Sequence, residues 1–189
     1  MRSFSILLFF VSTFFTLSSC EEGDVNPVDG ITIINLGDSE VLYNQSQSID
    51  VDGDGDSELT FVTVLAQENN TNQLQFRVFP IGANRVFEAG GRALMLNEGQ
   101  EIVPGNPFEK NVAPLVAKVE SNGSVTWQGD WLNANNHYLG FQIQLADGSV
   151  RYGWVRLSFN QASEKLIIHE LAYRHKSNTG LRAGQTEIF

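Results

Sequence analysis

The chain has 189 residues, a formal net charge of −10 and a single cysteine. This length suits one domain. The acidity argues against a nucleic-acid-binding protein, which needs a basic face, and one cysteine excludes an internal disulfide and a cysteine-based zinc site.

The first 19 residues have the layout of a secretory leader. Arg2 gives a positive start, and the run Ile6–Leu17 is apolar apart from small hydroxyl residues. This run is shorter than the roughly 20 residues of a membrane-spanning helix. The sequence Leu17-Ser18-Ser19-Cys20 resembles a bacterial lipobox, in which the cysteine receives a lipid, such as a palmitate-containing group, and the preceding segment is removed. We therefore predict a lipoprotein signal peptide over 1–19 and lipidation of Cys20; the alternative is an ordinary signal peptide cut elsewhere.

A lipidated Cys20 predicts the cellular location. Two or more acyl chains are enough for stable attachment, so the membrane is the first expected partner. Loss of Arg2 with the leader changes the net charge from −10 to −11. Glu21, Glu22 and Asp24 resemble the surface-export signal of Bacteroidota lipoproteins, and they also suit a plain solvated linker. We expect a lipid-anchored outer-membrane protein of the cell envelope, with the cell surface and the periplasmic face both open.

Residues 20–30 predict an acidic tether, and residues 31–189 predict one β-rich domain. The tether is polar and carries the turn pairs Asn26-Pro27 and Asp29-Gly30. Short runs rich in β-branched and aromatic residues follow, and no stretch has the sustained spacing of a helix. The expected strands are Ile31–Leu36, Leu59–Ala66, Leu74–Ile81, Arg92–Leu96, Val112–Val119, Tyr138–Leu145, Val150–Phe159 and Lys165–His175. This pattern predicts an all-β fold, a single antiparallel β-sandwich of jelly-roll-like arrangement.

The last three expected strands form the clearest local pattern. Asp147-Gly148 supplies a tight turn, since glycine tolerates positive φ, and a second turn follows near residues 160–163. We therefore predict a three-stranded antiparallel meander.

An acidic loop is the sharpest chemical feature. Carboxylates recur at alternate positions between glycines that permit a sharp turn, and together they can surround one hard cation: Asp50, Asp52, Asp54, Asp56 and Glu58. Phe61 stands where a helix-loop-helix calcium site would have a bidentate glutamate, so a true EF-hand is not expected. The loop resembles the DxDGDGxxD loops found between strands in secreted bacterial proteins. We predict a structural calcium ion here; the alternative is a metal-free turn solvated by water.

A resemblance extends over most of the mature chain. Its short motifs are the DxDGDG stretch, Gly140-Phe141, the segment Tyr152-Gly153-Trp154-Val155-Arg156-Leu157, and Ala172-Tyr173. In this order they are similar to secreted proteins of the PEP-CTERM-sorted type. The resemblance implies a secreted β domain without an assigned reaction. Those proteins end in a C-terminal sorting segment, whose place the lipid on Cys20 would take here. From the residues alone, Trp154 suits core packing, with ligand stacking as the alternative.

Two tryptophans lie in a loop rich in Gly and Asn. Exposed loop aromatics make sugar-stacking platforms, so Trp127 and Trp131 are candidate ligand-binding residues, with Asn133, Asn135 and Asn136 as possible readers of hydroxyl groups. The alternative is that both tryptophans cover the end of the sandwich.

No catalytic group stands out. His169 and His175 lie six residues apart on one expected strand, about 20 Å, which is too far for a shared metal. Strand alternation predicts that His169 and Glu170 point to opposite faces. A serine–histidine–acid triad stays open, because its members need not be neighbours in sequence, although no Gly-x-Ser-x-Gly motif is present.

These observations predict a lipid-anchored envelope β-sandwich that acts as a binding or structural module rather than an enzyme. Its partners, beyond the membrane, would be a glycan or an envelope protein. The alternatives are a small glycan-acting hydrolase and a purely structural envelope component. A hydrolase would show two carboxylates converging beside Trp127 or Trp131.

Overall fold

The structure is a computed structural model that describes residues 29–68 and 71–188. The predicted signal peptide, Cys20 and the tether as far as residue 28 lie outside the described residues. Within the described part, the chain contains strands and turns, and no helix there is long and apolar enough to cross a membrane.

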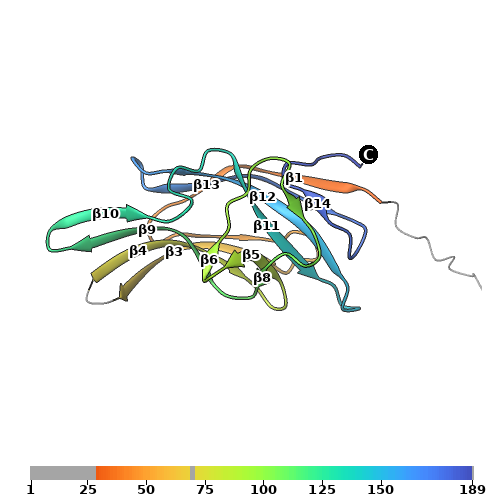
Figure 1. Ribbon diagram of the computed structural model, residues 1–189, viewed down its shortest axis with the longest axis horizontal. Coiled ribbons are helices and arrows are strands. Elements are labelled where there is room, and N and C mark those ends of the chain that lie inside the picture. The colour runs from red at the N-terminus through yellow and green to blue at the C-terminus, as the bar shows by residue number, and fades with distance from the viewer. Residues whose placement is uncertain (1–28, 69–70, 189) are drawn as a thin grey trace, which may run out of the picture.

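Fourteen strands are present in the described residues (Figure 1). They are β1 (Ile31–Val41), β2 (Ser46–Ile49), β3 (Leu59–Glu68), β4 (Thr71–Pro80), β5 (Arg85–Ala89), β6 (Arg92–Ala93), β7 (Glu101–Ile102), β8 (Phe108–Glu109), β9 (Ala113–Ser121), β10 (Ser124–Gln128), β11 (His137–Gln144), β12 (Val150–Asn160), β13 (Lys165–Arg174) and β14 (Leu181–Arg182).

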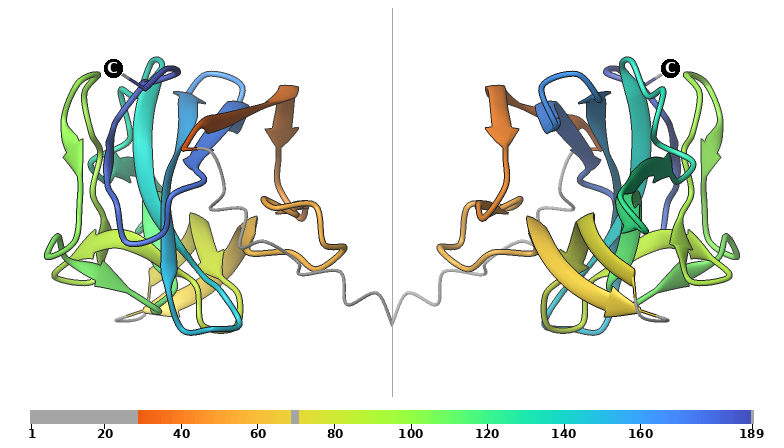
Figure 2. Two further views of the ribbon diagram at one scale, coloured as in Figure 1. Left: turned by 90° about the vertical axis from the view of Figure 1, so that its right-hand side faces the viewer. Right: turned by 90° about the vertical axis from the view of Figure 1, so that its left-hand side faces the viewer.

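Two antiparallel sheets pack face to face, and the prediction of an all-β sandwich is confirmed. The larger sheet has the order β1-β13-β12-β11-β5-β6, with β8 beside β5, and the smaller sheet has the order β10-β9-β4-β3-β2. Strands β14 and β7 form a separate pair. The predicted meander is β11-β12-β13, and Gly148 in its first turn has φ of 84°. The strands of the two sheets cross when viewed from the side (Figure 2).

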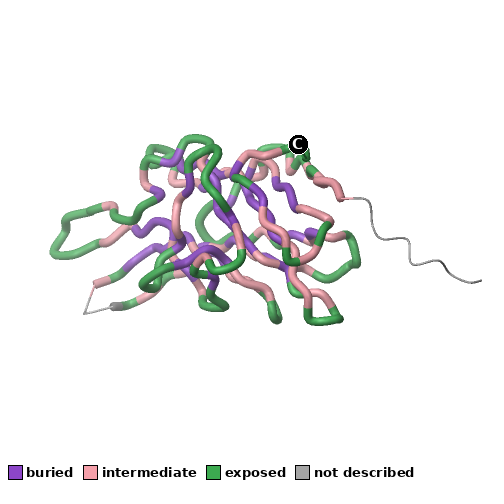
Figure 3. Tube along the Cα trace, turned by 45° about the vertical axis from the view of Figure 1, so that its right-hand side comes forward, coloured by how far each residue is buried: buried purple, intermediate pink, exposed green. Residues whose placement is uncertain are grey.

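The main core lies between the two sheets, where the buried segments concentrate in Figure 3. It follows from strand alternation: Val155, Leu157 and Phe159 of β12 point inward, and Phe76 from the smaller sheet meets the Phe159 ring edge-on at 5.0 Å. Burial of such large side chains is the dominant stabilising contribution in a fold of this kind.

A second core covers part of the outer face of the larger sheet. Trp154 is fully buried there, packs edge-on against Tyr138 at 5.1 Å and donates its indole N–H to the backbone oxygen of Gln185. The expectation of core packing for Trp154 is thus confirmed. Gly153 lies between the two cores, and a Cβ there would come within 2.2 Å of the Phe141 ring and 2.5 Å of a backbone oxygen, so only glycine fits.

The pairing of β13 is irregular at His169. Against β12, Arg156 pairs with Glu170 and Leu157 pairs with Ile168, so His169 is an extra residue on β13. The prediction that His169 and Glu170 face opposite sides is wrong: this β-bulge interrupts the alternation, and both side chains bond to residues of the same outer surface.

The first residues of the domain are fixed to β13. Arg174 makes a two-pronged ion pair with Asp29, at 3.0 Å and 2.6 Å, and the backbone of His175 donates to the oxygen of Gly30. Asp29 and Gly30, which the sequence assigned to the tether, therefore pack against the sandwich.

Candidate functional site

The acidic loop joins β2 to β3 and is shaped by its own residues. Gly53 and Gly55 have φ of 80° and 98°, a region that strongly favours glycine. Asp50 accepts hydrogen bonds from the backbone N–H groups of both glycines, at 2.7 Å and 2.9 Å, and Asp54 accepts one from Asp56. Such short-range bonds from aspartate to backbone fold a loop locally.

Three of the five predicted ligands converge. Carboxylate oxygens of Asp50, Asp52 and Glu58 lie within 4.8 Å of one another. Among the described residues, this is the one group of acidic, histidine or cysteine side chains that could hold a metal ion. Oxygens that bind one calcium at 2.3–2.6 Å lie at most about 5 Å apart, so this spacing fits a single ion. The structure does not bring Asp54 and Asp56 into the group.

The cluster reaches from the loop into the protein interior. Glu58 is only 6% exposed, and its Oε2 accepts a 2.6 Å hydrogen bond from the backbone N–H of Val51. Oδ1 of Asp52 is buried without a hydrogen-bond partner. A buried carboxylate oxygen that lacks a partner is costly, and a cation is the natural group to supply one.

Electrostatics at Glu58 point the same way. Burial raises the pKa of Glu58, and the negative charges of Asp52, Asp50 and Asp54 raise it further, while the hydrogen bond from Val51 acts in the opposite direction. The protein therefore resists a negative charge at this position. A divalent cation would offset both the burial and the repulsion.

Phe61, at the position of the EF-hand glutamate, lies fully buried in the main core. It belongs to β3, where strand alternation turns it toward the smaller sheet's inner face. The loop is thus a strand-to-strand connection and not a helix-loop-helix site.

The two candidate tryptophans occupy different environments. Trp131 is fully buried in the main core and donates its indole N–H to the backbone oxygen of Ala93 at 2.9 Å. It leaves no ring face for a sugar, so the structure contradicts its assignment as a stacking residue. Trp127 is partly buried, with its ring 5.5 Å from that of Phe159 and the Lys118 ammonium 6.0 Å from its centre.

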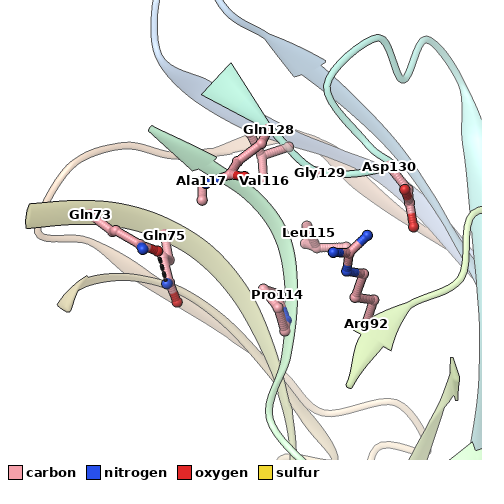
Figure 4. Close-up of a pocket in the computed structure, with 10 residues that line it drawn as sticks. All are labelled: Gln73, Gln75, Arg92, Pro114, Leu115, Val116, Ala117, Gln128, Gly129 and Asp130. Carbon is pink, nitrogen blue, oxygen red and sulfur yellow. Dashed lines mark hydrogen bonds between the residues drawn. The ribbon is translucent and has the colours of Figure 1, made fainter. Parts of the chain in front are cut away.

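A depression of about 280 Å³ lies beside the two tryptophans. Figure 4 shows it between Gln73 and Gln75 on one side and Arg92 and Asp130 on the other. Asp130 is the single carboxylate among its lining residues. The paired carboxylates that a glycoside hydrolase requires do not converge in this depression.

The asparagines of the tryptophan loop line another depression, of about 500 Å³. Asn133, Asn135 and Asn136 lie there with Ser158 and His169. Sequence reasoning did not join these residues, because the loop reaches β12 only through the fold. Comparison of the chain with protein-family models, with curated proteins and with solved structures found no match.

Proposed function

We propose that this chain is a lipid-anchored protein of the bacterial cell envelope whose β-sandwich is stabilised by one calcium ion in the loop between β2 and β3. The observation that carries the calcium proposal is the convergence of Asp50, Asp52 and Glu58, with Glu58 buried and one oxygen of Asp52 unpartnered. The support for the anchor is the lipobox-like Leu17–Cys20 sequence.

The ligand chemistry favours calcium over magnesium. All three groups are carboxylates, and calcium accepts irregular sets of six to eight oxygens, completed by backbone carbonyls and water. Magnesium demands a near-ideal octahedron and gives up its water reluctantly. The role is structural, because the ligands come from one loop and its end, where they fix Val51 and the start of β3.

Thermal melting of the mature domain tests the metal site. We expect millimolar calcium to raise the melting temperature by about 5 °C relative to chelator, since a ligand at about 50 times its Kd adds about 2 kcal/mol. Magnesium should give a smaller rise. Asp52→Asn should remove most of the calcium response.

Asp56→Asn is the matched control, because Asp56 lies in the same loop but outside the cluster. It should retain the full response. Equal melting temperatures in calcium and in chelator would contradict the metal proposal.

Fractionation of cells that make the full chain tests the anchor. The wild type should pellet with outer membranes and gain the mass of its acyl chains at Cys20. Cys20→Ala should be released, whereas Glu22→Gln, two residues away, should stay in the membrane. Retention of Cys20→Ala in membranes would rule out the lipid anchor.

A further inference from the structure

Three side chains from three different strands meet on the outer face of the larger sheet. His169 Nε2 lies 2.8 Å from Ser158 Oγ, and His169 Nδ1 lies 2.6 Å from Asp38 Oδ1. Ser158 belongs to β12, His169 to β13 and Asp38 to β1. This is the order of contacts in a serine–histidine–aspartate triad: hydroxyl to Nε2, and Nδ1 to carboxylate.

Irregular strand pairing creates this meeting. His169 is the extra residue of β13 against β12, and the segment Leu36–Asp38 of β1 lies opposite it. Gly37 and Asp38 both have positive φ, 65° and 55°, and the carboxamide of Asn35 accepts the N–H of Gly37. Figure 2 shows that the orange strand β1 changes direction along its length. Bulges of this kind re-aim side chains and are concentrated beside active sites.

The groups at the two ends of this series of hydrogen bonds have fixed roles. The backbone N–H of Asn136 donates to Ser158 Oγ at 2.9 Å, and an ionised Asp38 only accepts. In neutral His169 with Nδ1–H donating to Asp38, the Nε2 lone pair is free to accept the hydroxyl hydrogen of Ser158. This is the tautomer that a general base needs.

A second set of contacts holds Asn136 in place. Its carboxamide oxygen accepts a bond from Arg156 at 2.5 Å, and Arg156 also pairs with Glu170 at 3.0 Å. Asn136 itself has φ of 57°, an uncommon value for a residue with a side chain. Ser158 is thus part of a continuous series of hydrogen bonds and ion pairs, the outer-face network. Its six members are Asp38, Asn136, Arg156, Ser158, His169 and Glu170.

Ser158 and His169 line the depression of about 500 Å³ described above, which falls in the size range of small-molecule sites. The side chain of His169 is 13% exposed and Ser158 is 8% exposed, so both are largely buried and still line the depression. Asp38 is 74% exposed, and solvent weakens its influence on His169.

We propose that Ser158, His169 and Asp38 form a hydrolytic triad that cleaves short acyl esters. Ser158 Oγ attacks the ester carbonyl carbon while its proton moves to His169 Nε2. The bond from that carbon to the alcohol oxygen breaks, and His169 gives the proton to the departing alcohol. Water then attacks the acyl group on Ser158, passes a proton to His169, and releases the acid as Ser158 recovers its proton. The net reaction consumes one ester and one water and yields one acid and one alcohol.

The lining of the depression indicates the substrate class. Asn133, Asn135 and Asn160 line the same depression as Ser158, and the carboxamide oxygen of Asn160 already accepts the N–H of Ser163, which leaves its NH₂ group to donate. Amide groups suit a hydroxylated alcohol, and the mostly polar lining offers a long acyl chain little apolar surface. The proposed substrate is an acetyl ester of a sugar-like molecule. This inference is independent of the anchor and of the calcium ion.

The test uses the mature protein with a fluorophosphonate probe and with 4-nitrophenyl acetate. We expect mass spectrometry to find the probe on Ser158, and acetate ester hydrolysis above the buffer rate. Ser158→Ala should abolish both. His169→Gln, which keeps a hydrogen-bonding side chain, should slow hydrolysis at least about 100-fold. Asp38→Asn should slow it about tenfold, less than for a buried aspartate, because Asp38 is exposed.

Acetate should also be released from a peracetylated hexose, and a 4-nitrophenyl dodecanoate should react more slowly than the acetate.

Matched controls keep the result interpretable. Ser48→Ala removes an exposed hydroxyl on β2, and His175→Gln replaces a histidine just beyond β13; both should react as the wild type does. Melting curves identify any variant that fails to fold. Because labelling is measured on the wild type itself, absence of probe on Ser158 overturns the proposal even if a variant is unstable. Hydrolysis that persists in folded Ser158→Ala also overturns it, and a preference for the long chain overturns the substrate class.

Discussion

The acidic loop and the outer-face network are both polar clusters, but they are built in opposite ways. Asp50, Asp52 and Glu58 lie within nine consecutive residues and are shaped by local backbone bonds. Asp38, Ser158 and His169 come from three strands and depend on the pairing of a whole sheet. A cluster of neighbouring residues can be recognised in the sequence, and it keeps its geometry when strands shift slightly. A cluster assembled from three strands cannot be recognised in the sequence, and a small shift of one strand separates its members.

The largest effect should come from Glu58→Gln in the acidic loop, and its sign should depend on metal. The Gln side chain can still accept the N–H of Val51 but lacks the charge. In calcium, we expect a loss of about 2 kcal/mol of unfolding free energy through the lost ligand. In chelator at pH 7, we expect a gain, because burial and three neighbouring carboxylates disfavour the charged form in the folded state. Urea unfolding in both buffers measures the two values. A loss of unfolding free energy in both buffers would contradict the claim that the negative charge of Glu58 destabilises the metal-free folded state.

The next effect concerns Arg156, which links Asn136 to Glu170 in the outer-face network. Arg156→Ala removes a partly buried pair with Glu170 and the support of Asn136. We expect a loss of about 1 kcal/mol in stability and a larger, at least tenfold, fall in the labelling of Ser158, because the partner that holds its hydroxyl is released. Urea unfolding and a labelling time course give the two numbers. Lys165→Ala, which breaks the exposed pair with Glu40 on the same sheet, serves as control and should leave labelling unchanged.

The Asp29–Arg174 ion pair, like the outer-face network, joins residues that are distant in sequence. Its contribution to the free energy of unfolding should depend on pH. The Arg174 guanidinium holds the pKa of Asp29 below its ordinary value near 3.8. A carboxyl group with a lowered pKa in the folded state contributes stability that is present above the unfolded-state value. That stability is lost as the pH falls through the lowered value.

We therefore expect wild type to exceed Asp29→Asn in unfolding free energy by about 0.5–1 kcal/mol at pH 7, a difference that shrinks as the pH falls below the ordinary value near 3.8. Urea unfolding at several pH values measures it. The difference between the two proteins isolates Asp29 from Asp147, whose pKa is also lowered, by hydrogen bonds from Ser149. A difference that stays constant from pH 7 to pH 3 would contradict this account.

The smallest expected effect is that of a change in one cluster on the properties of the other. They share no residue and no hydrogen bond among the described contacts, so their energies should add. Ser158→Ala should leave the calcium-induced rise in melting temperature unchanged within about 1 °C. Chelator should leave the labelling rate of Ser158 unchanged. A clear effect in either direction would mean that the loop and the outer face are coupled through the sandwich.

Much of the fold could be predicted because its strands carry their own signals. The alternation of β12 and the Asp147-Gly148 turn produce the β11-β12-β13 meander, as expected. Two of the missed strands, β2 and β10, share one cause. Strand β2 reads Ser-Gln-Ser-Ile and is mostly polar because it lies at a sheet edge, and β10, also an edge strand, is exposed except for Trp127. Edge strands gain their pairing from a neighbour rather than from apolar alternation.

The candidate sites show the same limit. The convergence of Asp50, Asp52 and Glu58 could be anticipated from spacing, but the exclusion of Asp54 and Asp56 depends on which side chains turn inward at the start of β3. Burial of Trp131 could not be read from its polar neighbours, because Ala93, its hydrogen-bond partner, lies 38 residues away. A β-bulge in β13 brings His169 to Ser158. Such a bulge interrupts the alternation of side chains between the two faces of a strand, from which a sequence-based prediction assigns each residue to a face.

The bulge at Leu36–Asp38 has a further consequence for solubility. Strand β1 has 11 residues and forms an edge of the larger sheet, where unpaired backbone groups can recruit a second chain. Two consecutive residues at positive φ bend this edge and interrupt its regular row of donors and acceptors. The same distortion that turns Asp38 toward His169 thus shortens the straight template available for intermolecular strand pairing. At high protein concentration, it protects the sandwich against aggregation at its first strand.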